Sequence, residues 1–442
     1  MNKNQRRIFF FTMVIIFLII GPSLFMYSQG YRFDIKKFQF VETGGLYIKT
    51  FPEETRLYIN DEYINKTSFF TRDILVQNLL PDSYEIKIEK DGYHIWEKSL
   101  EIESKKVTEA KYIILFNKDN DFREIEEDIS NFYHDGNQIF FINSLNELFL
   151  YSSDKDKIER ILDATQLPDN IEEMSFLSNE NIIIRTSTGL YYLLDVENKK
   201  TKLIRSFNID SKNINNRNNK LIYQFNNSIY EVDPKEDSPK LLSRDRVDAF
   251  TIEQNSIIAL RENKIIKLYD LTRPEELLYS FDDYKNNYNY QIVFIEKELF
   301  IIENNRNLYL LNKETNSFDK KIETTTDLEY TSFFNKILFY DENDLWLMPL
   351  KRYESPFFKD AYSIINIGSF DKKIENIKWL NGDYFIFTLD KELHISEIDN
   401  RDNLNVFSLN KKNTSNLFFN GNNKKLFLLD NDEFLEIEKL IP

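Results

Sequence analysis

The chain has 442 residues, of which 42% are hydrophobic and 15% aromatic, and its formal net charge is −16. This composition excludes a disordered chain, and the negative charge argues against nucleic acid as a partner, because phosphate binding needs concentrated Lys and Arg. The sequence contains no cysteine, which excludes disulfides, thiolate metal sites and cysteine nucleophiles.

The N-terminal segment predicts a membrane helix. Residues 1–7 carry Lys3, Arg6 and Arg7, and residues 8–27 contain no charged side chain. A helix of that length spans about 30 Å, which is the thickness of a bilayer core. Basic residues before the apolar stretch favour a cytoplasmic tail at residues 1–7 and an exported remainder. We therefore expect residues 8–27 to be a signal anchor in the cytoplasmic membrane.

The alternative for this segment is a cleaved signal peptide. Gly21-Pro22-Ser23 offers small residues around a cleavage point after Ser23. The apolar stretch continues through residues 24–26 instead of ending there. An uncleaved anchor explains that continuation better.

Residues 28–43 form a polar linker, with an extended segment expected at Phe38–Val41. Residues 44–115 then alternate between apolar and polar side chains in short stretches, with turn residues such as Pro81-Asp82 between them. The pattern predicts a small β domain with five strands at Leu46–Thr50, Arg56–Asn60, Ile74–Asn78, Tyr84–Lys90 and His94–Ile102.

The same residues carry a family pattern. A first strand leads to a turn at Pro52, and Leu57–Asp61 ends in a hairpin turn. Lys66-Thr67-Ser68, Leu80–Tyr84 and Asp91-Gly92-Tyr93 follow in order. This segment resembles the PEGA domain family, although Glu54-Thr55 and Ser83 stand where that family has Gly-Ala and Gly. The resemblance implies a β-sandwich of envelope proteins that mediates binding, and it implies no catalytic residues.

Residues 116–442 contain a hairpin that recurs eight times, for example N-E-L-F-L-Y at Asn146–Tyr151 and R-N-L-Y-L-L at Arg306–Leu311. The first apolar residues of successive copies lie 36 to 48 residues apart. These first apolar residues are Leu148, Leu190, Ile229, Ile265, Leu308, Leu345, Leu393 and Phe434. A repeat of about 40 residues built only from short strands predicts a β-propeller. We expect about eight blades, with seven blades and an irregular unit as the alternative.

The last repeat stops just after its third strand, and we expect its outer strand to come from a segment upstream of the first repeat. Tyr112–Phe116 and Phe122–Ile125 are the two candidates. Closure by strands from both ends would remove the exposed sheet edges. The sequence has only ten glycines and none between Leu190 and Ile367, so Asn and Asp are expected at the turn positions with positive φ. The ring lacks WD and kelch signatures and resembles the diverse propellers of exported bacterial proteins.

The longest repeat spacing contains an insertion at Pro349–Phe370. Its Arg352, Tyr353, Phe357 and Phe358 form a candidate binding loop, because aromatic and Arg side chains on a long loop suit partner recognition. The alternative is an elongated outer hairpin that packs on its own blade.

Other polar clusters predict no chemistry. Asp119-Asn120-Asp121 and Asp341–Asp344 resemble calcium loops, but both lack the glycine and the bidentate Glu of such loops. The acids at Glu124–Asp128 are typical of a solvated strand, and the three histidines (His94, His134, His394) share no spacing. We expect no catalytic, cofactor-binding or metal-binding residues.

The sequence thus predicts an all-β protein after one N-terminal transmembrane helix. We interpret it as a membrane-anchored extracytoplasmic binding or scaffold protein of the cell envelope, with a protein or glycan as its partner and no enzymatic activity. One alternative is a propeller enzyme that acts on envelope glycans through carboxylates in the central channel. Another is a scaffold that assists the assembly of other envelope proteins.

Overall fold

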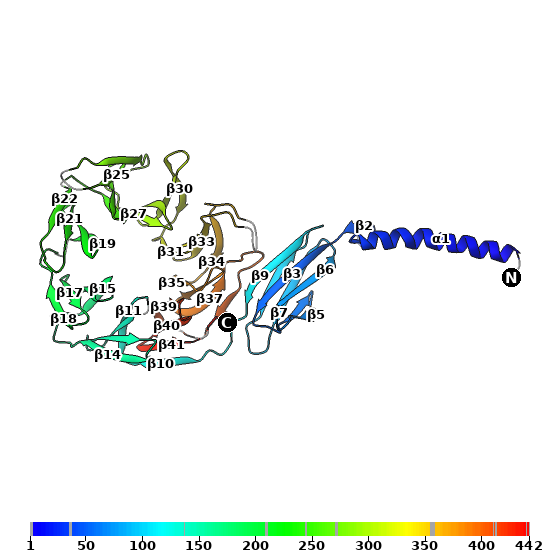
Figure 1. The fold of residues 1–442 in the computed structure, drawn as a ribbon, viewed down its shortest axis with the longest axis horizontal. Coiled ribbons are helices and arrows are strands. Elements are labelled where there is room, and N and C mark those ends of the chain that lie inside the picture. The colour runs from blue at the N-terminus through cyan, green and yellow to red at the C-terminus, as the bar shows by residue number, and fades with distance from the viewer. Residues whose placement is uncertain are drawn as a thin grey trace.

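A computed structural model gives the fold of this chain (Figure 1). It describes residues 3–34, 38–136, 138–207, 211–243, 245–269, 273–353, 359–409, 411, 413–438 and 440–441. In chain order, an N-terminal helix leads to a small β-sandwich, and the sandwich leads to a large ring of β-sheets. The helix lies at one end of the molecule and the ring at the other.

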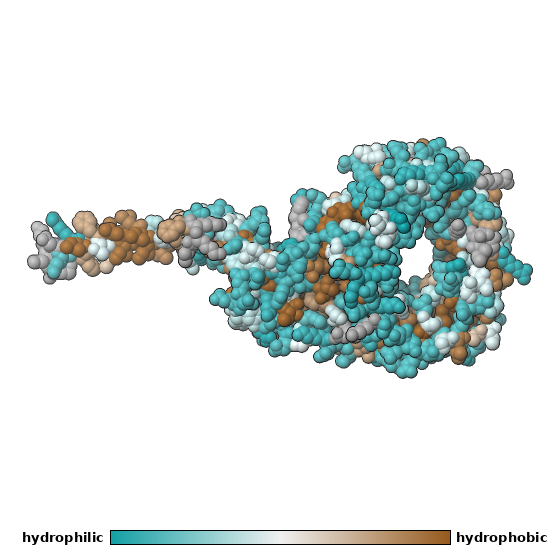
Figure 2. All heavy atoms as spheres, turned by 180° about the vertical axis from the view of Figure 1, so that it is seen from behind, coloured by the Kyte–Doolittle hydropathy of each residue, from teal (hydrophilic) through white to brown (hydrophobic). Residues whose placement is uncertain are grey.

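The predicted apolar helix is present as α1 (Lys3–Ser28). The most apolar window of α1 is not buried against the described remainder of the protein, and Figure 2 shows apolar side chains along its surface. The helix ends where the chain enters the left-handed region, at Gly30 with φ of 86°. The Gln29 and Gly30 amides donate to the carbonyls of Phe25 and Tyr27. A glycine in this conformation terminates helices without strain.

A short hairpin occupies the predicted linker. It consists of β1 (Tyr31–Asp34) and β2 (Gln39–Glu42), which pair antiparallel. The Thr43 amide and hydroxyl donate to the Gly30 carbonyl over 3.0 and 2.6 Å. The end of the helix is therefore fixed to the start of the sandwich by hydrogen bonds, with the hairpin between them.

The small domain is the predicted sandwich of two sheets, ordered β6-β3-β9 and β5-β4-β7-β8. Its strands are β3 (Gly44–Phe51), β4 (Arg56–Ile59), β5 (Glu62–Lys66), β6 (Asp73–Leu79), β7 (Ser83–Glu89), β8 (Trp96–Glu101) and β9 (Val107–Ile114). The sequence predicted five strands, and the structure has seven in this described segment. The two missed strands are β5, an exposed edge, and β9, which pairs parallel with β3.

Eight four-stranded sheets form the ring within the described residues, so the expected eight blades are observed. Blades 1 to 4 are β11–β14, β15–β18, β19–β22 and β23–β26 in that order. Their strands are Ile129–Asp135, Gln138–Asn143, Leu148–Ser152 and Lys157–Leu162; Ile171–Ser178, Asn181–Thr186, Tyr191–Asp195 and Lys200–Leu203; Lys212–Arg217, Lys220–Phe225, Ser228–Val232 and Lys240–Ser243; and Ala249–Glu253, Ser256–Arg261, Lys264–Leu268 and Glu276–Ser280.

Blades 5 to 7 are β27–β30, β31–β34 and β35–β38, and blade 8 contains β39–β41. Their strands are Tyr290–Ile295, Glu298–Glu303, Asn307–Asn312 and Ser317–Glu323; Glu329–Phe333, Lys336–Tyr340, Asp344–Pro349 and Ile365–Ser369; Ile374–Trp379, Tyr384–Leu389, Glu392–Glu397 and Val406–Ser408; and Thr414–Asn420, Lys425–Asp430 and Glu433–Ile437. The first strand of each blade lies toward the centre, and Figure 2 shows an opening through the ring.

The ring is closed by β10 (Phe122–Glu126), which pairs antiparallel with β41 as the outer strand of blade 8. Closure by residues 122–125 is therefore correct. The other candidate, Tyr112–Phe116, is wrong as a closing strand, because its residues Ile113 and Ile114 pair with β3 in the sandwich. Each blade thus has four strands without a strand from another chain.

Asparagine occupies several hairpin turns that need a positive φ. Asn218 and Asn219, like Asn226 and Asn227, both have positive φ, which is the conformation of a two-residue type I′ turn. Asn tolerates this region better than other non-Gly residues. The expected Asn residues are therefore found at these turns, and the turn at Glu296-Lys297 is an exception that adopts the same conformation without Asn or Asp.

Candidate functional site

The sandwich and the ring share one hydrophobic core. Trp96 and Phe116 from the sandwich side pack in the same buried cluster as Tyr384 and Phe407 of blade 7. The Phe116 ring lies 5.3 Å from the Tyr384 ring and 5.8 Å from the Phe407 ring. Because this apolar surface is removed from water only when the two domains are docked, it holds them together as one body.

A buried ion pair crosses the same junction. Trp96 and Lys98 alternate along β8, so both side chains point to one face of the strand. Lys98 Nζ lies 3.0 Å from Glu397 Oε1 at the end of β37, and these side chains are 0% and 5% exposed. The Trp96 indole donates to Glu397 Oε2 over 2.9 Å. Burial raises the pKa of the Glu397 carboxyl, and the Lys98 ammonium opposes that rise.

The loop after β37 completes the hydrogen bonds of this pair. Lys98 Nζ donates to the carbonyls of Asp399 and Arg401 over 2.7 and 3.1 Å, and also to that of Asn403. Asn405 Nδ2 donates to Glu397 Oε1 over 2.7 Å. A buried charge with every polar atom partnered is stable and also geometrically demanding. The junction therefore specifies one orientation of the sandwich on blade 7.

Further contacts fix the edges of the junction. Arg401 is held by Asp399 and donates to the Glu109 carbonyl of β9 over 2.9 Å. The Ile114 amide donates to the Tyr384 hydroxyl over 3.0 Å. Burial raises the pKa of Tyr384 well above its ordinary value, so this phenol stays protonated. These two bonds join the sheet that contains β9 to the ring, and Lys98 joins the sheet that contains β8.

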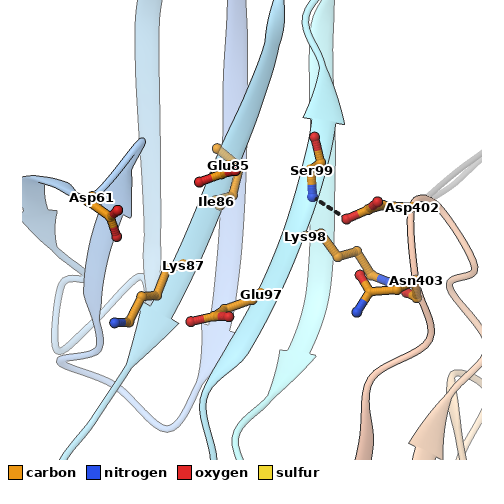
Figure 3. Close-up of a pocket in the computed structure, with 9 residues that line it drawn as sticks. All are labelled: Asp61, Glu85, Ile86, Lys87, Glu97, Lys98, Ser99, Asp402 and Asn403. Atoms are coloured by element: carbon orange, nitrogen blue, oxygen red, sulfur yellow. Dashed lines mark hydrogen bonds between the residues drawn. The ribbon is translucent and has the colours of Figure 1, made fainter.

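A polar cleft of about 420 Å³ opens beside the buried pair (Figure 3). Asp61, Glu85, Lys87 and Glu97 line it from the sandwich, and Asp402 and Asn403 line it from the ring, together with Ile86, Lys98 and Ser99. The Ser99 amide donates to Asp402 across the cleft over 2.8 Å. Lys98 is paired inside, so the open wall carries four carboxylates against one lysine. Because carboxylates accept hydrogen bonds and attract positive charge, the cleft suits a ligand that carries hydrogen-bond donors or cationic groups.

The predicted binding loop begins next to this junction. Tyr353 packs on blade 6 and blade 7, with Lys336 Nζ 4.4 Å above its ring and 3.4 Å from Asp383. Burial raises the pKa of Tyr353, and the carboxylates of Asp383 and Asp399 act in the same direction. The Asp383 carbonyl accepts the Ile398 amide over 2.9 Å, which connects this group to the loop that holds the sandwich. Burial also lowers the pKa of Lys336.

The four residues of that loop have different surroundings. Arg352 is exposed, and Tyr353 is half-buried between blades 6 and 7. Phe357 and Phe358 lie outside the described residues. Tyr362, further along the insertion, donates to Glu298 of blade 5 over 3.3 Å. The insertion therefore contacts the neighbouring blade as well as its own.

A second cavity of about 470 Å³ lies between blades 2 and 3. Glu173, Arg185 and Tyr191 line it. Arg185 Nη1 lies 3.4 Å from Glu172 and 3.7 Å from Glu173, and the two carboxylates are 51% and 60% exposed. This arrangement is an open ion-pair cluster and differs from an enclosed acid–base pair.

The remaining polar motifs have structural surroundings. Asp341 Oδ1 accepts hydrogen bonds from the amides of Asn343 and Asp344, as in an ordinary polar turn. His94 packs against Phe407, and His134 stacks on Phe418 at 3.6 Å between ring centroids. Among the described residues, no group of three or more His, Asp or Glu side chains is placed to hold a metal ion.

The junction residues Lys98 and Glu397 were not predicted from the sequence. A signal was present, because Lys98 shares the apolar register of Trp96 and Leu100, and Glu397 shares that of Leu393 and Ile395. Such a charge on a buried strand face indicates a partner. No role was predicted for Phe69 and Phe70 either. Their side chains are 61% and 89% exposed on the loop before β6.

Comparison with known proteins supports both parts of the fold. Residues 43–114 match the PEGA domain, which confirms the resemblance described above. The C-terminal WD40 domain of Sif2 is similar in structure, with a TM-score of 0.50 and 8% identity, covering 73% of this chain and 99% of that chain. The ring is therefore a β-propeller.

Two bacterial structures are similar at lower scores. BamB from Moraxella catarrhalis has a TM-score of 0.46 and 12% identity, covering 72% of this chain and 98% of that chain. PorZ of Porphyromonas gingivalis has a TM-score of 0.42 and 9% identity over 70% of this chain. The chain covers 42% of the PorZ chain. No curated protein matches the sequence.

Proposed function

We propose that this chain is a membrane-anchored scaffold of the cell envelope. In this proposal, α1 anchors it in the cytoplasmic membrane with the N-terminus inside, and the PEGA domain holds the propeller outside the cytoplasm. The propeller and the PEGA domain then engage a protein or glycan partner. The observation that carries the proposal is the common core at the junction, because a scaffold must present its binding surface in a fixed orientation.

The anchor is supported by the chemistry of α1. Its apolar span from Gln5 to Ser28 is long enough to cross a membrane, and within the described residues its most apolar window is not buried inside the protein. Exposed apolar helices are unstable in water, so a lipid environment accounts for this surface. Arg6 and Arg7 precede the span and favour a cytoplasmic N-terminus.

The sandwich supports the role of a rigid spacer. Strand β3 begins beside the helix end and reaches the ring side of the domain, where the Phe51 carbonyl accepts the Leu115 amide. Its eight residues span about 26 Å. With the helix end tied at Gly30 and the ring docked on β8, the propeller stands at a defined height above the membrane.

We propose no catalytic role for the chain. Partner recognition is assigned to the insertion at 349–370 and the adjoining junction, where Arg352 is exposed and Tyr353 anchors the loop. Long loops on a rigid scaffold carry binding functions in many proteins.

A topology experiment tests the anchor. The chain has no cysteine, so single cysteines placed at Asn4 and at Glu197 are unique labels. In protoplasts, a membrane-impermeant maleimide is expected to label position 197 and to label position 4 only after lysis. An N-terminal tag is expected to stay with the chain, because an uncleaved anchor retains it. Protection of position 197 in protoplasts would overturn the proposed orientation, and loss of the tag would show a cleaved signal peptide.

A crosslinking experiment tests the binding loop. A photoreactive amino acid at Arg352 is expected to capture a protein partner in intact cells. The matched control is Glu197, an exposed residue in the corresponding turn between the third and outer strands of blade 2. If the two positions give the same adducts, or if position 352 gives none, the insertion is not the protein-binding surface.

A further inference from the structure

The β1–β2 hairpin exposes three phenylalanines. Phe33, Phe38 and Phe40 are 42%, 83% and 44% exposed. Their rings form one cluster, because Phe33 lies 5.3 Å from both Phe38 and Phe40 in edge-to-face contacts. Phe33 and Phe40 are also direct cross-strand partners. Three clustered aromatic rings on a hairpin this small are poorly explained by contact with water alone.

The hairpin cannot lie far from the end of the membrane helix. Helix α1 ends at Ser28 and β1 begins at Tyr31. Four residues of strand extend about 13 Å, so the end of β1 at Asp34 and the start of β2 at Gln39 lie within roughly that distance of the base of the hairpin. The headgroup layer on each side of a bilayer core is about 5–8 Å thick. The phenylalanine cluster is therefore within reach of the lipid surface whenever α1 spans the membrane.

The base of the hairpin is held in place. The Arg32 guanidinium lies 3.4 Å from the centre of the Tyr27 ring on the last turn of α1, and it donates to the Tyr27 carbonyl over 3.1 Å. Lys105 of the sandwich pairs with Glu42 at the end of β2 over 2.7 Å. With the Thr43 bonds to Gly30, these contacts fix the hairpin between helix and sandwich.

We propose that the β1–β2 hairpin is a lipid-binding foot: Phe33, Phe38 and Phe40 insert into the headgroup layer of the membrane that α1 crosses. The inference rests on the proposed anchoring of α1. Aromatic and apolar side chains at this depth bind the interface while Arg and Lys remain near the phosphates. The foot gives the chain a second membrane contact beside the helix, and two contacts restrict the tilt of the PEGA domain and propeller.

Fluorescence quenching in vesicles tests the foot with the full chain. An environment-sensitive fluorophore is attached to single cysteines made by Phe38→Cys, Phe70→Cys and Ile16→Cys. Phe70 is the matched control, because it is exposed on the sandwich at the opposite end of β3, where the Thr50 amide donates to the Arg72 carbonyl. Ile16 lies in the middle of α1. The lipids carry a spin label either near the headgroup or near the bilayer centre.

We expect the headgroup spin label to quench the fluorophore at position 38 about twofold or more relative to position 70. The central spin label is expected to quench position 16. Adding Phe33→Ser and Phe40→Ser should reduce quenching at position 38, whereas Phe69→Ser and Phe70→Ser should not change it.

Three results would overturn the foot. If positions 38 and 70 are quenched equally while position 16 is still quenched, the hairpin does not bind lipid. Membrane anchoring by α1 is then unaffected. Absence of quenching at position 16 refutes the anchor and removes the basis of the foot. Shielding at position 38 that grows with protein density but not with the headgroup spin label would assign the cluster to contact between copies of the chain.

Discussion

Glu397→Ala is expected to destabilise the docked protein by about 3–5 kcal/mol, because it leaves the Lys98 ammonium buried without a counter-charge. The Trp96 indole and the Asn405 amide lose their acceptor in the same change. Urea unfolding of the full chain in detergent, followed by tryptophan fluorescence, measures the effect directly, since Trp96 lies in the junction. We expect the sandwich to unfold at lower urea than the propeller, whereas the unaltered chain keeps the two coupled.

Two further variants give this experiment its controls. Lys372→Ala removes a partly exposed pair with Glu392, with side chains 49% and 37% exposed, and should cost less than about 1 kcal/mol. The double variant Lys98→Met/Glu397→Leu removes both charges and should recover most of the stability. If Glu397→Ala costs no more than Lys372→Ala, the buried pair does not hold the junction.

Glu436→Ala is expected to weaken the closure of the ring by about 2–3 kcal/mol, a smaller value than for a fully buried pair because Arg123 is half exposed. Glu436 lies on β41 with its side chain 0% exposed. It accepts hydrogen bonds from Arg123 of β10 over 3.2 Å, from Lys425 over 2.9 Å and from the Tyr151 hydroxyl of blade 1 over 3.2 Å. One carboxylate therefore joins the closing strand, its own blade and the next blade.

Limited proteolysis and urea unfolding measure this second effect. Cleavage between the sandwich and blade 1 should become faster in Glu436→Ala, because β10 separates from β41 more often. Glu438→Ala is the matched control, since Glu438 pairs with the same Lys425 over 2.8 Å but is 57% exposed. Equal protease sensitivity of the two variants would mean that Glu436 is not needed for closure.

The propeller could be predicted from the sequence because the pattern that identifies each blade lies within a few consecutive residues. In Asn227–Val232 the turn residue and the strand that follows it lie within a few positions, and the same arrangement recurs in every blade. The closing strand was one of two upstream candidates, and the pairing of β10 with β41 confirms the candidate at residues 122–125. Strand β9 was missed because its partner β3 lies in the other half of the domain and pairs with it in parallel.

The junction could not be predicted, because it depends on contacts between distant parts of the chain. The register of β8 places Lys98 on the buried face, and the register of β37 does the same for Glu397. Each residue taken alone indicates a buried charge. Nothing in the sequence pairs them, since they meet only after the sandwich has docked on blade 7. The packing of Tyr353 against blade 7 could not be predicted for the same reason, because it also depends on residues distant in the sequence.

The closure of the ring has a consequence for biosynthesis. Arg123 of β10 and Glu436 of β41 are 313 residues apart in the chain. At about 5–20 residues per second, β41 leaves the ribosome roughly 15–60 s after β10. During that interval β10 is an unpaired strand, and its charged residues Arg123, Glu124 and Glu126 disfavour pairing with other chains. The charged residues of β10 thus protect this strand from pairing with other chains until β41 has been synthesised.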